Sequence, residues 1–455
     1  MERVLIFTGT AKKGDVVTFH TIILYLALTV ISFVVFFPTF SNEFQLAWDD
    51  TWQVIENPLI QNFSIASVFS HFIQYWQGQY SPVNSLLYLG IFWLYGMDAG
   101  AFHAICLLLH LVCSFLVLSV SRSVFSKLLP SVSQRDKNVY AFFTAIAFAI
   151  HPVQVESVAW ISASKILLYG FFTLLALWTY IRYLGAQRRI WLFLTAFIYI
   201  LCFGSKEQGI LLPLNLLLMD WIWGRFTVNE ETKKIPYRVL WEKIPFLILC
   251  LAFYYFNWAN GGSPGSSSAY PVPQRLVFSA YSLVEYVFRF LAPVKLYFFH
   301  PYPISPGEPL PLYFFGYFLL AGLIIYFVWE QARKGNRLIL FGFYFFLFNL
   351  LLVLHLIPLP RPVITADRYL YLSVIGLAWM LIGLADQWQG IGNRKIKTSF
   401  LLCGGLIWLI LLSCQSHLRT LEWKDSDTTK SNVLELMEKN PLPEDSEPLF
   451  NLVKP

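Results

Sequence analysis

Long apolar runs separated by short polar stretches recur along the whole chain. A helix rises about 1.5 Å per residue and needs roughly 20 apolar residues to cross a hydrocarbon core of about 30 Å. Eleven stretches are candidate membrane spans: 17–37, 101–121, 139–158, 165–184, 190–204, 209–223, 242–258, 311–329, 338–357, 369–386 and 398–414. The pattern predicts an all-α polytopic membrane protein, a bundle of about eleven transmembrane helices.

Two further apolar stretches are not counted as spans. PVNSLLYLGIFWLYG (82–96) is too short to cross. Residues 275–300 are long enough, but polar side chains recur every three or four positions and form a stripe on one helical face: Arg275, Ser279, Ser282, Tyr286 and Arg289. Such a helix either lies in the interface, in-plane or re-entrant, or lines an aqueous cavity.

The charges give the chain an orientation and exclude one class of partner. Only 13% of the residues are charged, whereas about a quarter are charged in an ordinary soluble protein. The net charge of +6 comes without a dense basic run, so no nucleic-acid partner is expected. If 275–300 does not cross and the N-terminus is cytoplasmic, most of the 33 Lys and Arg residues fall in cytoplasmic loops, as the positive-inside rule requires.

This topology divides the chain into three regions. Residues 1–16 form a cytoplasmic N-terminus, 17–414 a transmembrane module with a first outer loop at 38–100, and 415–455 a polar tail. The tail is expected on the outer face, with a single short helix that Pro441 ends. The loops that carry unusual polar residues all fall outside, so any chemistry is expected on the extracytoplasmic face.

Asp49 and Asp50 in AWDDTWQVIENPLI are the first candidate for that chemistry. A carboxylate pair at the lip of a membrane can act as a general base toward a hydroxyl, or hold a divalent cation against a phosphate. Adjacent side chains in an extended loop point in opposite directions, so the two need not act on the same atom. A solvated acidic turn is the alternative.

Ionisable residues at the outer ends of other spans form the second candidate. The basic members are His151, Lys165, Lys206 and Arg368, and the acidic residues beside them are Glu156, Glu207 and Asp367. Such groups are costly in hydrocarbon and often functional. A helix-capping histidine, snorkelling lysines and local Lys–Glu or Asp–Arg pairs are the structural alternatives.

Taken in order, several stretches carry a resemblance. They are AWDDTWQVIENPLI, QYSPVNSLLYLGIFWLYGMDAGAFHAICLLLH, AFAIHPVQVESVAWIS, SKEQGILLPLNLLLMDW, WEKIPFLIL, RLVFSAYSLVEYVFRFLAPVKLYFFHPYP, TADRYLYLSVIGL and WKDSDTTKSNVLELMEKNP. From about residue 40 to 441 the chain resembles the transmembrane part of the GT-C-type glycosyltransferases that carry tetratricopeptide repeats, which are protein O-mannosyltransferase-like.

The resemblance implies a membrane enzyme that transfers a sugar from a polyprenyl-phosphate-linked donor. The acceptor would be a protein, typically at a Ser or Thr hydroxyl, or a glycan. The acidic motif of the first outer loop is catalytic in that family, which maps to Asp49 and Asp50. His151, Lys165, Lys206 and Arg368 would then neutralise the donor phosphate, with Glu156, Glu207 and Asp367 in support. A divalent metal ion, held by Asp49 or Asp50, is left open as a cofactor.

The resemblance implies that 82–96 and 275–300 are in-plane helices of the outer face that shape the site, and it also implies a cellular location. It implies a multi-pass protein of a bacterial cytoplasmic membrane or an ER-type membrane, with membrane lipids and subunits of a membrane complex as further partners.

Two departures from the family pattern motivate a second hypothesis. In ISASKILL, Lys165 is present, but Ser164 and Ile166 stand where Arg and Asp are expected. The tail also holds at most one repeat-like helix where relatives carry arrays. The rival to an active transferase is therefore a catalytically inactive GT-C scaffold that serves as a structural or adaptor subunit.

Overall fold

The computed structural model describes most of the chain. The described residues are 19–61, 63–226, 237–259, 270–294, 296–297, 300–357, 363–390 and 394–439. The predicted N-terminus 1–16, parts of the predicted stretches 17–37 and 275–300, Pro441 and the end of the tail lie outside them. The described part is almost entirely helical, as the spacing of apolar residues predicts, and its only sheet has two short strands.

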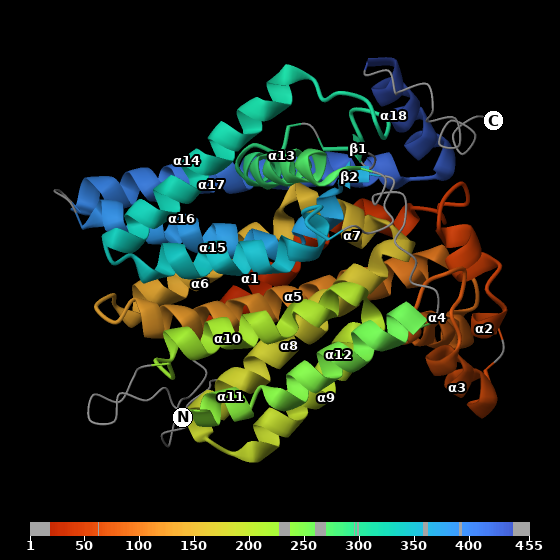
Figure 1. Ribbon diagram of the computed structural model, residues 1–455, viewed down its shortest axis with the longest axis horizontal. Helices are drawn as coiled ribbons and strands as arrows, with labels where there is room; N and C mark the ends of the chain where they lie inside the picture. Colours follow the sequence, from red (N-terminus) through yellow and green to blue (C-terminus); the bar gives the residue numbers. More distant parts are fainter. Residues whose placement is uncertain are drawn as a thin grey trace.

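Long helices form the body of the molecule and run roughly side by side (Figure 1). They are α1 (Phe19–Phe36), α5 (Ala99–Leu128), α6 (Gln134–Ile150), α8 (Ser164–Ala186), α9 (Arg189–Ser205), α10 (Leu212–Ile222), α12 (Ile244–Ala259), α14 (Gly316–Arg333), α15 (Arg337–Leu350), α16 (Ser373–Gln389) and α17 (Arg394–Thr420). Short helical turns extend three of them: η1 (Phe37–Ser41), η8 (Leu351–Val353) and η10 (Leu421–Trp423).

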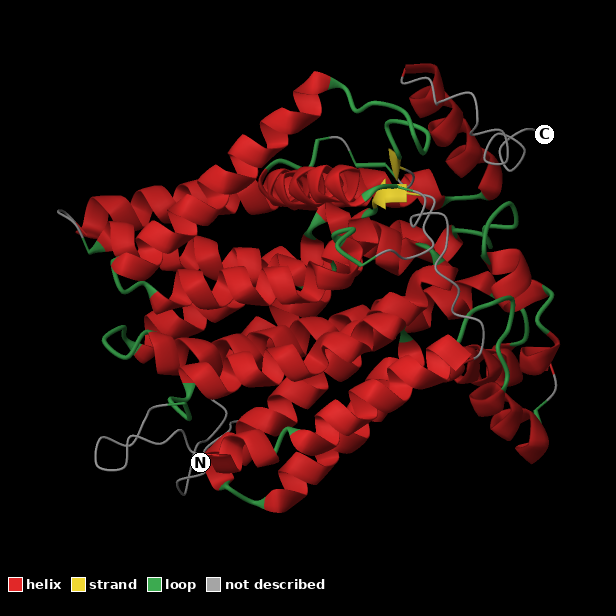
Figure 2. Ribbon diagram, in the orientation of Figure 1, coloured by secondary structure: helices red, strands yellow, loops and turns green. Residues whose placement is uncertain are grey.

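Short elements gather at one end of this bundle, which we call the loop end (Figure 2). They are η2 (Thr51–Ile55), α2 (Pro58–Gln61), α3 (Ile65–Ile73), α4 (Pro82–Tyr95), η3 (Pro152–Gln154), α7 (Val155–Ala159), η4 (Ile161–Ala163), η5 (Glu207–Leu211), β1 (His300–Pro301), η7 (Leu312–Phe315), β2 (Val363–Thr365), η9 (Asp367–Leu370) and α18 (Ser426–Lys439). Helix α11 (Tyr237–Trp241) lies at the opposite end, and α13 (Val272–Leu291) packs against α14.

The helices are apolar and long enough to make this a multi-pass membrane protein. Within the described residues six of them pass a length and hydropathy test for a membrane span, at Thr21–Ser41, Ala99–Leu128, Ile161–Ala186, Val239–Phe256, Leu312–Arg333 and Ile396–Trp423. A seventh is added if Gln134–Ile150 and Pro152–Ala159, bent by 49° at His151, form one span. Helices α4 and α9 are apolar but shorter, and the count of eleven crossings stays a prediction.

Burial distinguishes the centre of the bundle from its rim. Most of α8 is buried among its neighbours, whereas α17 keeps a row of apolar side chains on the outside, including Leu402, Leu406 and Ile410. In water such a face would be costly, at about 25 cal/mol per Å² of apolar surface. An outward apolar stripe on a long helix fits contact with lipid.

The polar stripe of the 275–300 stretch faces protein. On α13, Ser282 and Arg289 are buried and donate hydrogen bonds to the strand-bearing segment, at the Ile364 carbonyl and at Thr365 Oγ1, 3.4 and 2.9 Å away. Tyr286 Oη accepts the Ala366 N–H at 3.3 Å. The stripe therefore fixes the chain that leads into η9, and the orientation of α13 relative to the membrane stays a prediction.

A charged cluster ties helices together at the end opposite the loop end. Asp220 at the end of α10 is fully buried and pairs with Arg225 at 2.9 Å and with Lys243 at 2.7 Å. Arg225 also pairs with Glu242 at 2.6 Å, and Tyr180 of α8 donates to Asp220 at 2.7 Å. Because each buried charge has an opposite partner, the cluster connects the start of α12 to α8 and α10 without an unpaired ion.

Helices α15 and α16 approach each other at two glycines. A Cβ atom added at Gly376 would lie 2.4 Å from the Gly342 carbonyl oxygen and 2.6 Å from the Phe346 nitrogen, and one added at Gly342 would lie 2.5 Å from the Gly376 carbonyl oxygen. Both obstacles are backbone, which cannot move without displacing a helix. The glycines therefore set the separation of the two helices, as small residues do at membrane helix contacts.

Replacing Gly376 by alanine is expected to destabilise the fold. The added methyl group overpacks the contact and should cost about 1–3 kcal/mol, measured as a lower melting temperature of the purified protein in detergent. Gly322→Ala on α14 is the matched control, because nothing lies within 4 Å of its Cβ position. Equal melting temperatures for the two variants would contradict this role.

Candidate functional site

Asp50 is a buried carboxylate that joins two segments far apart in sequence. It is fully buried. Its Oδ1 accepts hydrogen bonds from the backbone N–H of Ser162, at 2.9 Å, and from the Ser162 hydroxyl, and its Oδ2 accepts the Gln45 N–H at 2.8 Å. The acidic loop (residues 42–57) is thereby attached to η4, at the point where α8 begins.

Burial is the main influence on the protonation of Asp50. Loss of contact with water raises the pKa of this carboxyl, and the charge of Asp49 raises it slightly further. The hydrogen bonds from Ser162 and Gln45 lower the pKa, and the net result is a pKa of about 6. Asp50 is therefore largely ionised at neutral pH and takes up a proton as the pH falls through 6.

Asp49 lies in a different environment from Asp50. It is half-buried, and its two oxygens lie 3.4 Å from the Trp52 indole N–H and 3.2 Å from the Gln53 amide, both of which donate to it. Both donors come from η2, so the helical turn after the pair turns Asp49 away from the scaffold that holds Asp50. The neighbouring carboxylates thus point to different partners.

Lysines from two other segments lie near Asp49. Lys165 at the start of α8 feels the charges of Lys206, Asp49, Glu207 and Arg368, and its ammonium group donates to Gln79 Oε1 at 2.8 Å. Lys206, nearly buried between α9 and η5, lies 3.5 Å from the Glu207 carboxylate. Predicted basic residues that are far apart in sequence are therefore brought to one region.

Arg368 joins the same region from η9. Its guanidinium and its backbone N–H both donate to the buried carboxylate of Glu156, the latter at 2.9 Å. The indole of Trp160 and the ring of Tyr369 flank it, with ring centroids 5.4 and 5.1 Å away. Burial lowers the pKa of Arg368, because it disfavours the charged form. The negative charge of Glu156 outweighs burial, and with smaller contributions from Tyr369 and Asp49 it raises the pKa of Arg368 above its ordinary value.

Asp367 belongs to a separate ionic cluster whose other members, Arg289 and Arg419, are distant in sequence and follow no local pattern. This fully buried carboxylate pairs with Arg289 of α13 at 3.1 Å and with Arg419 of α17 at 2.7 Å. Arg419 also donates to the Pro152 carbonyl oxygen at 3.0 Å. Asp367 thus holds three segments together. Because a buried carboxylate is costly without opposite charges, an Asp at the start of a span is itself a sequence signal for cationic partners elsewhere in the chain.

His151 packs against α13 and not against Lys165, Lys206 or Arg368. Its ring stacks on Phe290 of α13, and its Nε2 lies 2.9 Å from the Phe290 carbonyl oxygen. Nδ1 accepts the Val153 N–H at 3.3 Å, which makes Nε2 the protonated nitrogen. Both nitrogens are used where α6 ends and the chain bends, so the structure does not bring His151 to the Asp49 region.

The described residues contain no group of three or more His, Cys, Asp or Glu side chains arranged to hold a metal ion. Asp50 already uses both carboxylate oxygens for protein hydrogen bonds. Asp49 alone could offer a carboxylate, with substrate phosphate and water as the remaining ligands. The metal therefore stays a prediction.

The tail helix α18 holds the acidic loop from its other side. Trp48 donates through its indole to Thr429 Oγ1 at 3.1 Å, and the Thr429 hydroxyl lies 2.9 Å from Gln45 Oε1. The Ala47 N–H donates to Ser426 Oγ at 3.1 Å. Because Gln45 also donates to Asp50, a continuous set of hydrogen bonds runs from α18 through the loop to the buried carboxylate.

Replacing Thr429 by valine is expected to loosen the acidic loop. The variant loses its bonds to Gln45 and Trp48, and at roughly 1 kcal/mol each their loss should speed amide exchange in residues 43–50 by roughly tenfold or more. Hydrogen–deuterium exchange with mass spectrometry measures this. Ser431→Ala is the control, because among residues 19–439 that the structure describes the Ser431 hydroxyl bonds within α18, to the Asp427 carbonyl oxygen. Unchanged exchange in the Thr429 variant would show that α18 does not hold the loop.

Comparison with known proteins gives a distant similarity. The chain is 28% identical over 171 residues to a human protein named Protein O-mannosyl-transferase TMTC4, a match that covers 35% of this chain and 23% of that protein. The chain thus matches less than a quarter of that relative's length. No family model matches, and no solved structure does. The similarity links this multi-pass membrane protein loosely to a protein O-mannosyl-transferase.

Proposed function

We propose that this protein is a membrane glycosyltransferase that moves a sugar from a polyprenyl-phosphate-linked donor to an acceptor hydroxyl on the extracytoplasmic face. One observation carries the proposal: the half-buried carboxylate of Asp49 shares its region with Lys165, Lys206 and Arg368, at the loop end of a membrane bundle. A base beside several cations suits a reaction in which a hydroxyl loses a proton and a phosphate departs with negative charge.

The chemistry is a single displacement with inversion. The acceptor oxygen attacks the anomeric carbon and gives up its proton to Asp49, while the bond between that carbon and the donor phosphate oxygen breaks. The electron pair leaves with the polyprenyl phosphate, and Lys165 and Lys206 neutralise it. Arg368 contributes to the positive field, although its guanidinium is already paired with Glu156.

Asp50 serves as a positioning residue in this proposal. Both of its oxygens are engaged by Ser162 and Gln45, so it has no face left for substrate. Its role is to fix the backbone of the acidic loop so that the Asp49 carboxylate stays in place. Such support matters because misplacement of a catalytic group by about 1 Å can cost roughly a hundredfold in rate.

The name of the human relative suggests the first substrates to try. Mannose on a polyprenyl phosphate is the donor, and a Ser or Thr side chain of a protein is the acceptor. A protein with this donor would lie in a bacterial cytoplasmic membrane or an ER-type membrane, with the loop end outside the cytoplasm.

An inactive scaffold is the second candidate, and the surroundings of two residues favour it. Ser164 donates to Asn84 Oδ1 at 2.8 Å and lies 2.7 Å from the Tyr88 hydroxyl, and Ile166 is buried. Both positions, charged in the pattern that the chain resembles, are here part of the helix packing. A protein that forms a stable stoichiometric complex and transfers no sugar would have this role.

Substitution of the two carboxylates separates the candidates. In membranes supplied with radiolabelled polyprenyl-phosphate mannose, Asp49→Asn is expected to lower transfer to protein about 10²- to 10⁴-fold, the usual contribution of a general base. Asp50→Asn should lower it about tenfold, because Asn cannot accept from both Ser162 and Gln45. Membrane abundance should not change in either variant.

Asp98→Asn is the matched control for this experiment. Asp98 lies in the same predicted outer loop. Its carboxylate caps α5 by accepting the Ala101 N–H at 3.2 Å, with no further hydrogen bond to the side chains that the structure describes, and Asn caps equally well. This variant should keep full activity. If the wild type transfers mannose and Asp49→Asn transfers it equally fast, the proposed mechanism is wrong.

A further inference from the structure

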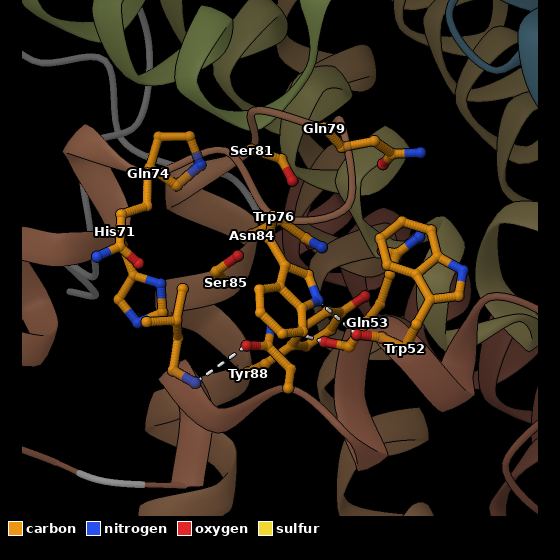
Figure 3. A pocket seen from close by; sticks show the side chains of 13 residues that line it. Trp52, Gln53, His71, Gln74, Trp76, Gln79, Ser81, Asn84, Ser85 and Tyr88 are labelled. Atoms are coloured by element: carbon orange, nitrogen blue, oxygen red, sulfur yellow. Dashed lines mark hydrogen bonds between the residues drawn. The ribbon is translucent and has the colours of Figure 1, made fainter.

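A pocket lies between the acidic loop, α3 and α4, beside the region of Asp49 (Figure 3). The turn between α3 and α4 covers it, with Gln77 and Gly78 in the left-handed backbone region and Trp76 paired to Gln79. The Trp76 indole N–H donates to the Trp52 carbonyl oxygen at 2.7 Å and closes one side. The pocket is therefore built by segments of the first loop alone.

The side chains that line the pocket are polar but carry no fixed charge. They are chiefly amides, hydroxyls and indoles, and no Asp, Glu, Lys or Arg is among them. Indole faces pack against the C–H faces of a ring, and amides and hydroxyls both donate and accept hydrogen bonds. A neutral ligand rich in hydroxyl groups matches this lining, whereas a phosphate or a charged peptide does not.

His71 of α3 points into this pocket with unused hydrogen-bonding capacity. Its side chain is 97% buried, since its exposed fraction is 3%, and neither ring nitrogen has a hydrogen-bond partner among the described residues. Burial lowers the pKa of His71, and a contact with the Leu59 backbone acts in the other direction. That contact can occupy one ring nitrogen and leaves the other for a ligand. The neutral ring offers one donor and one acceptor, and a buried polar group without a partner is costly enough to need a ligand or water.

Three hydrogen bonds connect the pocket to the proposed reaction centre. Trp52 and Gln53 line it and also donate to the Asp49 carboxylate. Gln79 lines it and accepts from Lys165. A ligand held here would therefore lie between the proposed base and the cation proposed to meet the leaving phosphate.

The size of the pocket decides which part of a ligand it encloses. The cavity volume is about 20 Å³, enough for one water-sized group. It is partly open to the surface, so a ring can lie across its mouth while one hydroxyl-bearing substituent enters. Ser85 of α4 and Gln74, which follows α3, lie along this path and make no side-chain hydrogen bond within the described part of the chain.

We infer that this pocket binds the sugar unit of the donor, with His71 and Ser85 hydrogen-bonded to ring hydroxyls and the indoles of Trp52 and Trp76 against the ring. The inference rests on the proposed function. It makes His71 a specificity-determining residue that acts on the sugar and takes no part in proton transfer.

The test measures sugar binding apart from transfer. The experiment is saturation-transfer NMR on the full-length protein in detergent, with methyl α-mannoside as the probe. The probe should give a signal, and added free mannose should reduce that signal by competing for the same site. His71→Ala and Ser85→Ala should each weaken binding roughly tenfold, the effect of one lost hydrogen bond to a polar ligand, and should raise the donor KM while kcat changes little. His417→Ala, which lies between α1 and α17, is the control and should bind like the wild type.

The outcomes separate this inference from the proposed function. Binding that depends on His71 and Ser85 supports the pocket even if no sugar transfer is found, in which case the proposed function alone fails. If both variants transfer sugar with an unchanged donor KM and have normal melting temperatures, the inference about the pocket is wrong and the proposed function stands. Competition for the pocket by a serine-containing peptide or by inorganic phosphate, and not by mannose, also overturns it.

Discussion

The hydrogen bonds accepted by Asp50 are the interaction on which the candidate site depends. A buried carboxylate is costly unless donors surround it, and Ser162 and Gln45 provide them from opposite sides. Ser162 belongs to the turn that starts α8, so the bond fixes the acidic loop relative to Lys165, only three residues further on. Gln45 in turn connects the loop to Trp423 and to Thr429 of the tail. One carboxylate thereby aligns the first loop, the middle of the chain and its end.

The pair Asp49–Asp50 divides two tasks between adjacent residues. Asp50 anchors the loop, and Asp49 is left half-exposed in the region of the lysines. The same division appears at Asp367–Arg368, where Asp367 holds Arg289 and Arg419 in the scaffold and Arg368 extends toward Glu156 and the Asp49 region. In each of these two pairs, one charged side chain holds the scaffold and its neighbour extends toward the region of Asp49.

Sequence patterns predicted the fold class, because helices of membrane length need apolar runs that can be counted. They also singled out Asp49, Lys165, Lys206 and Arg368, since isolated charges beside apolar runs are conspicuous. In the structure the charges of the other three act on Lys165, and their role in a site stays a prediction. They did not assign partners: that Asp367 pairs with Arg289 and Arg419 depends on contacts between α13, η9 and α17, which no local pattern encodes. The role of Ser162 and the pocket at His71 were missed because serines and histidines in ordinary surroundings carry no signal until the fold places them.

The central claim is that the loop end binds a lipid phosphate beside Asp49. A cryo-electron microscopy structure of the purified protein with polyprenyl-phosphate mannose tests it most directly. The account predicts density for the phosphate within contact distance of Lys165 and Lys206, and for the mannose next to Asp49. A lipid phosphate bound at the opposite end of the bundle, or density that leaves both lysines and Asp49 without contact, would contradict it.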